Sequence, residues 1–209
     1  MNKPGLILIG AGGHAHACID VIEQHGGYHI SGLIGMPNEI NDYHFGYEVI
    51  GTDDDLPELT KKFQYALITL GQSKTPAHRI KMYQQVFELG FQLPTIIAPS
   101  AYVSRHATLG SGTIVMHGAI VNAGVSVGNN CIINTRALLE HDATVADHCH
   151  ISTGAILNGN TSIGTGSFVG SGSTIKEGAS LGQGCLVGMG LVVRHNQRDR
   201  AQFSGYKAP

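Results

Sequence analysis

Charged residues are scarce in this chain of 209 residues, and their scarcity limits its partners. Lysine and arginine total 13, aspartate and glutamate total 15, and the formal net charge is −2. Nucleic acids and anionic membranes attract proteins chiefly through positive charge, which this composition does not supply in excess. We therefore expect no nucleic acid and no membrane as the main partner.

Long apolar runs and paired cysteine motifs are also missing. No run approaches the length of about 18 apolar residues that a membrane-spanning helix needs. The run Leu6–Ile9 is too short for the core of a secretion signal and leads straight into glycines. The four cysteines show no zinc-site spacing. These absences favour a cytoplasmic protein, because thiols stay reduced in that compartment.

What the chain has in abundance is a hexad repeat. The repeated position is aliphatic in seventeen successive hexads: Ile97, Val103, Leu109, Val115, Val121, Val127, Ile133, Leu139, Val145, Ile151, Leu157, Ile163, Val169, Ile175, Leu181, Val187 and Val193. The position four further along is small in all but one of its occurrences, from Ala101 to Cys185. If about a third of residues are aliphatic, chance gives such a run roughly once in 10⁸.

Neither a helical period nor simple strand alternation explains a period of six. We interpret each hexad as one short strand and one turn, with three hexads forming a triangular coil. The aliphatic residues point inward and stack between coils that lie ~4.8 Å apart. Three of the four cysteines fall at the small inward position, so we expect core residues rather than disulfides. Glycines and asparagines at the turns, among them Gly164 and Gly166, suit positive φ angles.

Residues 1–95 carry no hexads and alternate strand and helix patterns instead. Strands are expected at Leu6–Ile9, His29–Ile34, Val49–Gly51 and Ala66–Leu70, and helices after Gly13, from Asp53 or Asp54, and over Pro76–Leu89. Such alternation predicts a small parallel α/β, Rossmann-like domain over residues 1–95. The repeat predicts a parallel β-helix over residues 96–209, with Pro94 and Pro99 marking the join.

A glycine turn follows the first expected strand. Gly10-x-Gly12-x-x-Ala15 matches the loose dinucleotide fingerprint, in which backbone N–H groups and a helix N-terminus face a phosphate. A nicotinamide cofactor also needs an acidic residue about 20 positions later, where this chain has Gly35 and Met36. We therefore favour a substrate phosphate or nucleotide over NAD. A tight strand–helix turn without a ligand is the alternative.

One corner of the repeat carries a chemically suggestive group of side chains. His141 comes two positions after the inward Leu139, so it should project outward, and Glu140 and Asp142 flank it. A carboxylate beside an imidazole raises its basicity and fixes its tautomer, as a general base near neutral pH requires. A solvated charged corner is the other interpretation, and spacing alone does not decide between them.

Histidines could also suggest a metal, since one class of β-helix enzymes binds zinc through three of them, as a carbonic anhydrase. That site needs three imidazoles converging between subunits at about 2.0–2.1 Å from the metal. His106, His117 and His148 show no common pattern that would bring them together. We therefore expect no metal.

Taken together, these features resemble the NeuD/PglD-like sugar acetyltransferases over nearly the whole chain. This family includes sialic acid O-acetyltransferases and nucleotide-amino-sugar N-acetyltransferases. The resemblance is carried by Leu8-Ile9-Gly10-Ala11-Gly12-Gly13-His14, Ile68-Thr69-Leu70-Gly71, Asn134-Thr135, Glu140-His141-Asp142 and His150-Ile151-Ser152-x-Gly154-Ala155. It implies a left-handed β-helix, a homotrimer with active sites between subunits, and an N-terminal domain that holds a sugar nucleotide.

The resemblance also implies roles for particular residues. His141 matches the general base, and Asp142 its supporting acid. The remaining matches are His150, Ser171 and Met189 for contacts with the cosubstrate acetyl-CoA, and Gly12, Gly13, His14 and Gly71 for contacts with the small-molecule sugar substrate. Because the cysteines of the repeat should point inward, we expect direct transfer rather than an acyl-enzyme.

The activity implied is N-acetylation of an amino group on a nucleotide-linked sugar, in surface polysaccharide biosynthesis. The alternative within the family is O-acetylation of a sialic-acid-like sugar. Outside it, a zinc hydratase and a non-catalytic trimer that binds a nucleotide sugar stay open. The chain departs from the family pattern at Gly35-Met36, where many members carry two aspartates, and at Gly205–Pro209, where many end in a Gly-x-Pro-Ala-Lys-like motif.

Overall fold

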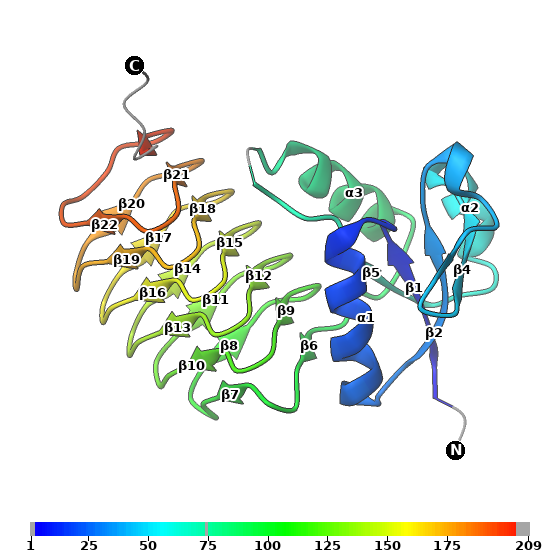
Figure 1. Ribbon diagram of the computed structural model, residues 1–209, viewed down its shortest axis with the longest axis horizontal. Coiled ribbons are helices and arrows are strands. Elements are labelled where there is room, and N and C mark those ends of the chain that lie inside the picture. Colours follow the sequence, from blue (N-terminus) through cyan, green and yellow to red (C-terminus); the bar gives the residue numbers. More distant parts are fainter. Residues whose placement is uncertain (1–2, 74, 204–209) are drawn as a thin grey trace. The chain divides into compact units, whose positions relative to one another are not determined.

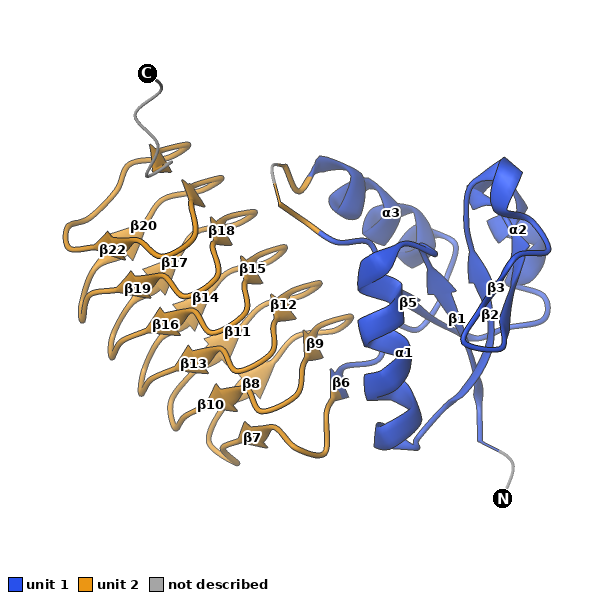
Figure 2. Cartoon of the chain, in the orientation of Figure 1, with its two compact units in different colours: residues 1–71, 77–96 blue, residues 72–76, 97–209 orange. Residues whose placement is uncertain are grey.

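The computed structural model describes residues 3–73 and 75–203, which fall into two compact units (Figure 2). The N-terminal unit comprises Met1–Gly71 and Ala77–Ile96, and the prism unit comprises Gln72–Pro76 and Ile97–Pro209. The atypical C-terminal motif, Gly205–Pro209, lies outside the described residues. No helix in the described part of the chain is long and apolar enough to span a membrane.

The N-terminal unit is built on one sheet with the strand order β3-β4-β2-β1-β5. Its strands are β1 (Gly5–Ile9), β2 (His29–Ile34), β3 (Tyr43–His44), β4 (Tyr47–Gly51) and β5 (Tyr65–Ile68). Pairing is parallel from β4 through β5, which confirms the predicted parallel α/β architecture. The antiparallel pair β3–β4 was not predicted. Phe45 and Gly46 connect it, both with positive φ, as a type I′ hairpin turn requires.

Helices cover the buried strands of this sheet. The helical segments are α1 (Gly13–His25), η1 (Pro37–Glu39), η2 (Asp53–Asp55), α2 (Leu56–Leu59) and α3 (Ala77–Glu88). Helix α1 ends where Gly26 adopts the left-handed conformation and donates its N–H to the Ile22 carbonyl. Helix α3 presents Met82 and Val86 to the same apolar cluster as Ile7 of β1. Their spacing of four places both side chains on one helix face.

Strand β5 is shorter than expected, because it stops at Ile68 instead of Leu70. Arg79 of α3 is 1% exposed and explains this end. Its Nη1 donates to the carbonyls of Ile68 and Leu70 at 2.7 and 2.8 Å. The buried guanidinium therefore occupies two backbone carbonyls that a longer β5 would use to pair with a neighbouring strand. Charge-assisted hydrogen bonds of this kind are strong.

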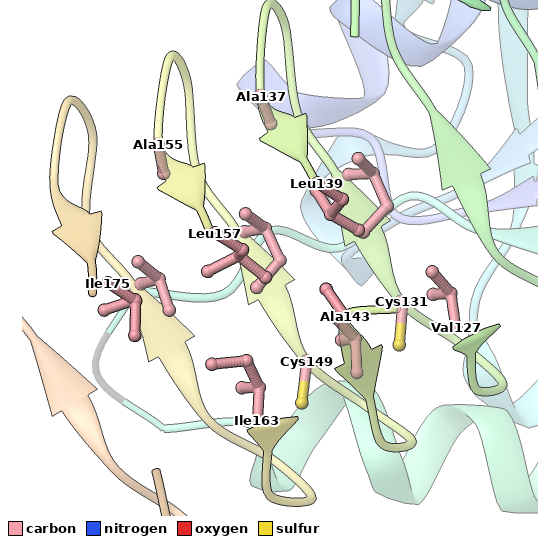
Figure 3. Close-up of a cluster of buried hydrophobic side chains, with 14 of the residues drawn as sticks. Val127, Cys131, Ala137, Leu139, Ala143, Cys149, Ala155, Leu157, Ile163 and Ile175 are labelled. Atoms are coloured by element: carbon pink, nitrogen blue, oxygen red, sulfur yellow. The ribbon is translucent and has the colours of Figure 1, made fainter. Parts of the chain in front are cut away.

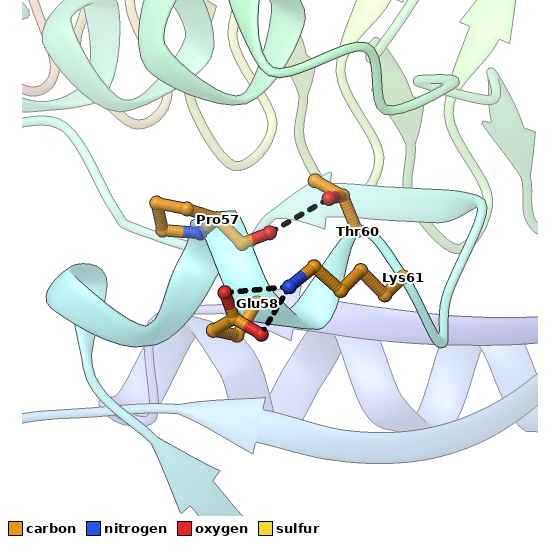
Figure 4. A network of polar contacts seen from close by, with 4 residues as sticks. All are labelled: Pro57, Glu58, Thr60 and Lys61. Atoms are coloured by element: carbon orange, nitrogen blue, oxygen red, sulfur yellow. Dashed lines mark hydrogen bonds and ion pairs between the residues drawn. The ribbon is translucent and has the colours of Figure 1, made fainter.

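Helix α2 carries a polar network on its outer side (Figure 4). Lys61 Nζ lies 2.6 Å from Glu58 Oε2, and the Thr60 hydroxyl donates to the Pro57 carbonyl at 2.8 Å. Both charged side chains are more than two thirds exposed, so the ion pair contributes about 0–1 kcal/mol. The helix is held in place by its apolar side instead, which buries Leu56 and Leu59 in the core.

The prism unit is a left-handed parallel β-helix with three sheets in its described residues (Figure 1). The six-strand face holds β7 (Tyr102–Val103), β10 (Ile120–Val121), β13 (Leu138–Leu139), β16 (Ile156–Leu157), β19 (Thr174–Ile175) and β22 (Val192–Val193). The five-strand face holds β8 (Thr108–Leu109), β11 (Ser126–Val127), β14 (Thr144–Val145), β17 (Ser162–Ile163) and β20 (Ser180–Leu181). The seven-strand face holds β6 (Ile96–Ile97), β9 (Ile114–Val115), β12 (Ile132–Ile133), β15 (His150–Ile151), β18 (Phe168–Val169), β21 (Leu186–Val187) and β23 (Gln202–Phe203).

All seventeen repeated aliphatic residues belong to one hydrophobic cluster, which confirms the predicted interior. Those from Val115 to Val193 are at most 3% exposed, and the three of the first coil pack against them while partly buried. Figure 3 shows Leu139, Leu157 and Ile175 stacked on successive coils. From β6 to β19 each strand lies beside the strand three hexads further along, as Val121 pairs in parallel with Leu139. The register therefore repeats once per triangular coil.

The small inward residues sit near the corners and satisfy backbone groups there. The thiol of Cys131 donates to the carbonyl of Ala146 at 3.2 Å, and the hydroxyl of Ser167 donates to that of Gly182 at 3.0 Å. In both pairs the acceptor belongs to the next coil. All four cysteines are buried thiols, as expected for core residues. A small side chain thus fills the corner and also donates a hydrogen bond to a buried backbone carbonyl.

The expectation that the turn glycines and asparagines have positive φ is correct for some of them and wrong for the others. Gly166 has a φ of 71°, but Gly164 is not left-handed. A Cβ on Gly164 would lie 2.5 Å from the backbone carbon of Gly182 in the next coil. Glycine is required there because two coils approach closely. The expectation fails at the equivalent positions Gly110, Gly128 and Gly182, and also at Asn129, which follows Gly128.

The inward and outward positions of β14 offer a test of this interior. Val145 is 3% exposed, whereas its neighbour Thr144 has nearly the same shape and is exposed. We predict that Val145→Ala lowers the free energy of unfolding by about 1.5–3 kcal/mol, because it removes buried apolar surface. Thr144→Ala, the matched control, should change it by about 0.5 kcal/mol or less. Equal effects in urea denaturation would contradict the assigned interior.

Candidate active site

The residues with the chemistry of a general base lie at one corner of the prism. His141 is in the turn between β13 and β14, where the six-strand and five-strand faces meet. Its side chain is 56% exposed and that of Asp142 is 59% exposed. His141 Nδ1 lies 3.0 Å from Asp142 Oδ2. The corner therefore presents an imidazole and a carboxylate, already paired, to whatever approaches this edge.

The backbone of the corner explains the pairing. Asp142 has a φ of 60°, a left-handed conformation that aspartate tolerates better than most residues. If Nδ1–H donates to the carboxylate, Nε2 is left as the acceptor, which is the tautomer a base needs. The hydrogen bond to the Asp142 carboxylate is the largest cause that raises the pKa of His141, and the charges of Asp142, Glu140 and Glu177 raise it further.

Glu140 does not compete for the imidazole nitrogen. Its Oε2 accepts from Asn122 Nδ2 of the preceding coil at 3.1 Å and from the backbone N–H of His141 at 3.4 Å. The glutamate is thereby held beside the corner and acts on His141 through its charge. Two acids of different function thus flank one histidine, and it is Asp142 that hydrogen-bonds to the ring.

His150 differs sharply from His141, although both were predicted to be in the site. It lies on β15 in the seven-strand face and is 7% exposed. Its Nδ1 lies 2.6 Å from the carbonyl of Gln72, and its Nε2 lies 3.0 Å from Asn134 Nδ2. Nδ1–H therefore donates to Gln72, and Nε2 accepts from Asn134. This imidazole fastens the segment from residue 72 to the prism.

Ser171 and Met189 lie at a second corner, between the seven-strand and six-strand faces. They are separated by three hexads, so they occupy the same place in successive coils. Ser171 Oγ is 2.9 Å from Ser152 Oγ, and Met189 is 69% exposed. The six-strand face separates this corner from the corner of His141. One chain alone does not bring these residues together with His141.

The predicted sugar-binding residues are in the N-terminal unit, where Gly12 lines a pocket of about 230 Å³ but Gly13, His14 and Gly71 are not among its lining residues. The pocket is lined by Ile9, Gly10, Ala11, Gly12, Ile34, Gly35, Met36, Glu39, Asp53, Leu70 and His78. Gly71 is close to His14, since a Cβ on Gly71 would lie 3.5 Å from His14 Cβ. Gly12 and Gly13 face open space, because a Cβ on either would meet no described atom within 4 Å.

Helix α1 begins at this pocket with an uncapped end. Gly12 provides no side-chain cap, and no acidic residue stands in the first turn, which starts at Gly13. The positive end of the helix dipole is therefore not compensated by the helix itself. Farther along, His14 Nε2 lies 3.5 Å from Cys18 Sγ on the next turn. The arrangement favours an anionic group beside Gly12 and Gly13.

Three polar residues of the pocket were not predicted: Glu39, Asp53 and His78. Glu39 is the most informative, because its Oε2 accepts the backbone N–H of Met36 at 2.7 Å. A carboxylate thus stands after β2, although Gly35 and Met36 supply none. The signal was present as Pro37 at the start of a helical turn and an acid at its third position, which reaches back to the preceding N–H.

The described residues offer no metal site beside these groups. Among residues 3–73 and 75–203, no three histidine, cysteine, aspartate or glutamate side chains gather closely enough to hold a metal ion. The predicted site residues lie in four places: the polar corner of His141 and Asp142, the seven-strand face with His150, the second corner with Ser171 and Met189, and the N-terminal unit with Gly12, Gly13, His14 and Gly71.

Comparisons with known proteins match both units. The model of the PglD N-terminal domain matches residues 5–86, and that of the hexapeptide repeat of succinyl-transferase matches residues 160–194. A search of curated protein sequences finds no match. PerB from Caulobacter crescentus, solved with CoA and GDP-perosamine, is 30% identical with a TM-score of 0.89, covering 98% of this chain and 96% of its own.

Two further structures extend the comparison. The acetyltransferase domain of PglB from Neisseria gonorrhoeae, in complex with acetyl coenzyme A, is 31% identical with a TM-score of 0.89. The match covers 98% of this chain and 97% of that domain. WeeI from Acinetobacter baumannii is 17% identical, with a TM-score of 0.75 and coverage of 98% and 99%, and it shows the fold alone.

The pairing of His141 with Asp142 predicts a measurable titration. Because a hydrogen bond to the carboxylate raises the pKa of His141, the ring keeps its proton to a higher pH than an ordinary histidine. Asp142→Asn should lower that pKa, and asparagine suits the left-handed corner, as Asn160 shows at a φ of 55°. Glu140→Gln should lower it less. An unchanged NMR titration of His141 in Asp142→Asn would contradict the assigned bond.

Proposed function

Because the chain belongs to the NeuD/PglD-like family of sugar acetyltransferases, we propose that it transfers the acetyl group of acetyl-CoA to an amino group of a nucleotide-linked sugar. Two relatives with about 30% identity match over nearly their whole length. One of them was solved with CoA and GDP-perosamine, and the other with acetyl coenzyme A. The single observation that carries the proposal is the exposed His141–Asp142 pair at a corner of the β-helix.

The reaction uses His141 as general base. Nε2 removes a proton from the acceptor nitrogen as that nitrogen forms a bond to the thioester carbonyl carbon. The carbon–sulfur bond then breaks, and the CoA thiolate takes the proton from the imidazolium. Asp142 keeps the ring in the required tautomer and stabilises its charged form through the bond at Nδ1.

Backbone N–H groups beside the bound thioester stabilise the developing oxyanion. His150 is a contact to acetyl-CoA rather than a donor to that oxyanion, because its N–H is already given to the Gln72 carbonyl. Ser171 and Met189 contact the cosubstrate at the second corner. The pocket beside Gly12 and Gly13 takes the nucleotide, with a phosphate at the N-terminus of α1.

Transfer is direct, without an acyl-enzyme on a cysteine. The four thiols are buried, and three of them line the interior of the prism. Burial raises the pKa of Cys18 to about 12. The pKa of Cys149 is raised well above its ordinary value, chiefly by the hydrogen bond with Cys131 and to a smaller extent by burial. A protonated, inaccessible thiol is not a nucleophile.

The active enzyme is a homotrimer with its sites between subunits. Support comes from the outward side of the six-strand face, which is mostly apolar: Tyr102, Ile120, Leu138, Ile156, Thr174 and Val192. Tyr102, Ile120 and Val192 are 58%, 40% and 60% exposed. The same position on the five-strand face holds only threonine and serine. An exposed apolar patch of this kind marks an interface. In the proposed threefold arrangement, His141 of one copy lies beside Ser171 and Met189 of the next.

An acetyl-transfer assay with several acceptors tests the proposed reaction. We predict that the protein acetylates nucleotide-linked amino sugars. His141→Ala should lower turnover roughly 10²- to 10⁴-fold, because a positioned general base accelerates the reaction by about this factor. His25→Ala, at the C-terminal end of α1, is the control and should keep full turnover.

The same assay separates the alternatives. Faster acetylation of a free sialic-acid-like sugar at a hydroxyl would favour O-acetylation. Nucleotide-sugar binding without any turnover would favour a non-catalytic trimer. Near-normal turnover of His141→Ala would remove this residue from the mechanism.

The trimer predicts a second, independent outcome. Ile120→Asp introduces a charge into the apolar patch, so it should dissociate the assembly in sedimentation experiments and abolish turnover with it. Ser162→Asp places the same charge on the five-strand face and should leave the trimer intact. A wild-type protein that sediments as an active monomer would refute a site shared between subunits.

A further inference from the structure

We propose that Gly159 is a positioning residue for His141, because its missing side chain leaves the space in which the imidazole lies. This inference rests on the proposed role of His141 as general base. Gly159 is in the coil that follows His141, three hexads farther along the chain. It lies against the ring with its own backbone and has no group that could react.

The turn itself does not demand glycine at this place. The same corner position in successive coils holds Arg105, Ala123, His141, Gly159, Glu177 and His195. Gly159 is the single glycine of this column. Its φ is not in the left-handed region, so any residue could adopt its backbone conformation. Whether a side chain fits at this position therefore depends on the neighbouring atoms.

The nearest of these atoms belong to the imidazole of His141. A Cβ on Gly159 would lie 2.5 Å from His141 Nε2, 2.6 Å from Cε1 and 3.2 Å from Cδ2. The ring therefore covers the Cα of Gly159, and the glycine is buried while Ala123 and Glu177 of the same column are exposed. Distances under 3.0 Å to a Cβ are not tolerated, so a single added methyl group would force the ring to move.

The carboxylate of Asp142 has a matching space on the preceding coil. A Cβ on Gly124 would overlap Asp142 Oδ1. Gly124 and Gly178 occupy the same corner position with φ angles of 76° and 70°, but a Cβ on Gly178 would meet no described atom within 4 Å. The catalytic pair therefore sits between two glycines, one in the coil before it and one in the coil after it.

Displacement of the ring should affect the chemical step more than binding. Nε2 is the atom that takes the proton, and it is also the atom closest to the absent Cβ. A misplacement of about 1 Å can cost roughly 100-fold in rate. We therefore expect Gly159→Ala to lower kcat about 10- to 100-fold, with little change in the KM for the nucleotide sugar, because the proposed function assigns its nucleotide to the pocket of the N-terminal unit.

Gly178→Ala is the matched control for a methyl group added to this edge of the prism. It strains a left-handed residue in a later coil but meets no described side chain, so its kcat should stay near that of the wild type. Gly124→Ala carries the same backbone strain and also meets the carboxylate, so it should lower kcat. Circular dichroism and sedimentation of each variant establish that the fold and assembly persist.

A double-mutant cycle separates positioning from other effects of the methyl group. In a His141→Ala background there is no ring to displace, so Gly159→Ala should have no further effect on the residual rate. In the single variant, the NMR titration of His141 should move toward the ordinary histidine value, because the displaced ring loses its bond to Asp142. A purely structural effect would not produce this pattern.

Three outcomes would overturn the inference. Wild-type kcat in Gly159→Ala would show that the ring does not need this space. An equal loss of rate in the presence and absence of the His141 ring would show that the glycine serves acetyl-CoA directly. An unchanged His141 titration would show that the ring stays paired with Asp142. Failure of the proposed function is a separate result, since it appears as an active His141→Ala variant.

Discussion

The stacking of inward aliphatic side chains, one in every hexad, is the constraint on which the rest of the prism depends. Each coil can pair with the next only if its interior residues fall above one another, so the register is fixed at three hexads per coil. This fixed register also determines which surface residues become neighbours. It places His141 against Gly159 and Asp142 against Gly124, although the members of each pair are a full coil apart in sequence. A hydrophobic interior thereby sets the geometry of a polar corner.

Two histidines of the prism show how position decides chemical character. His141 is at an exposed corner, where the carboxylate of Asp142 is paired with Nδ1. His150 lies on a strand of the seven-strand face, where a backbone carbonyl and an amide occupy both of its nitrogens. In the proposed reaction the first exchanges a proton with the acceptor. The second is a structural tie to the segment beginning at Gln72, since both of its nitrogens are hydrogen-bonded.

The candidate site of the N-terminal unit is formed mainly by backbone groups, whereas that of the prism is formed by side chains. Its parallel strands end at a turn of glycines, and the uncapped end of α1 offers a partial positive charge at the same place. Arg79 closes the end of β5 by binding two carbonyls, while Glu39 folds back onto the N–H of Met36. The pocket thus has a helix N-terminus suited to a phosphate and a carboxylate on its wall. A nucleotide has groups for both, since its phosphates suit the helix end and its base or ribose can hydrogen-bond to a carboxylate.

The sequence by itself determined the period-six interior, the parallel α/β unit before it and the candidate base with its acid, because each depends on residues close together or evenly spaced. Only the tertiary structure decided which groups meet across long separations. It brought Glu39 into the pocket, used His150 to hold residue 72, placed Gly159 against an imidazole and set His141 and Ser171 at opposite edges of one face. Periodicity fixes which way a side chain points, whereas its partners depend on how coils stack and how loops return, and these distances are not encoded in any local pattern.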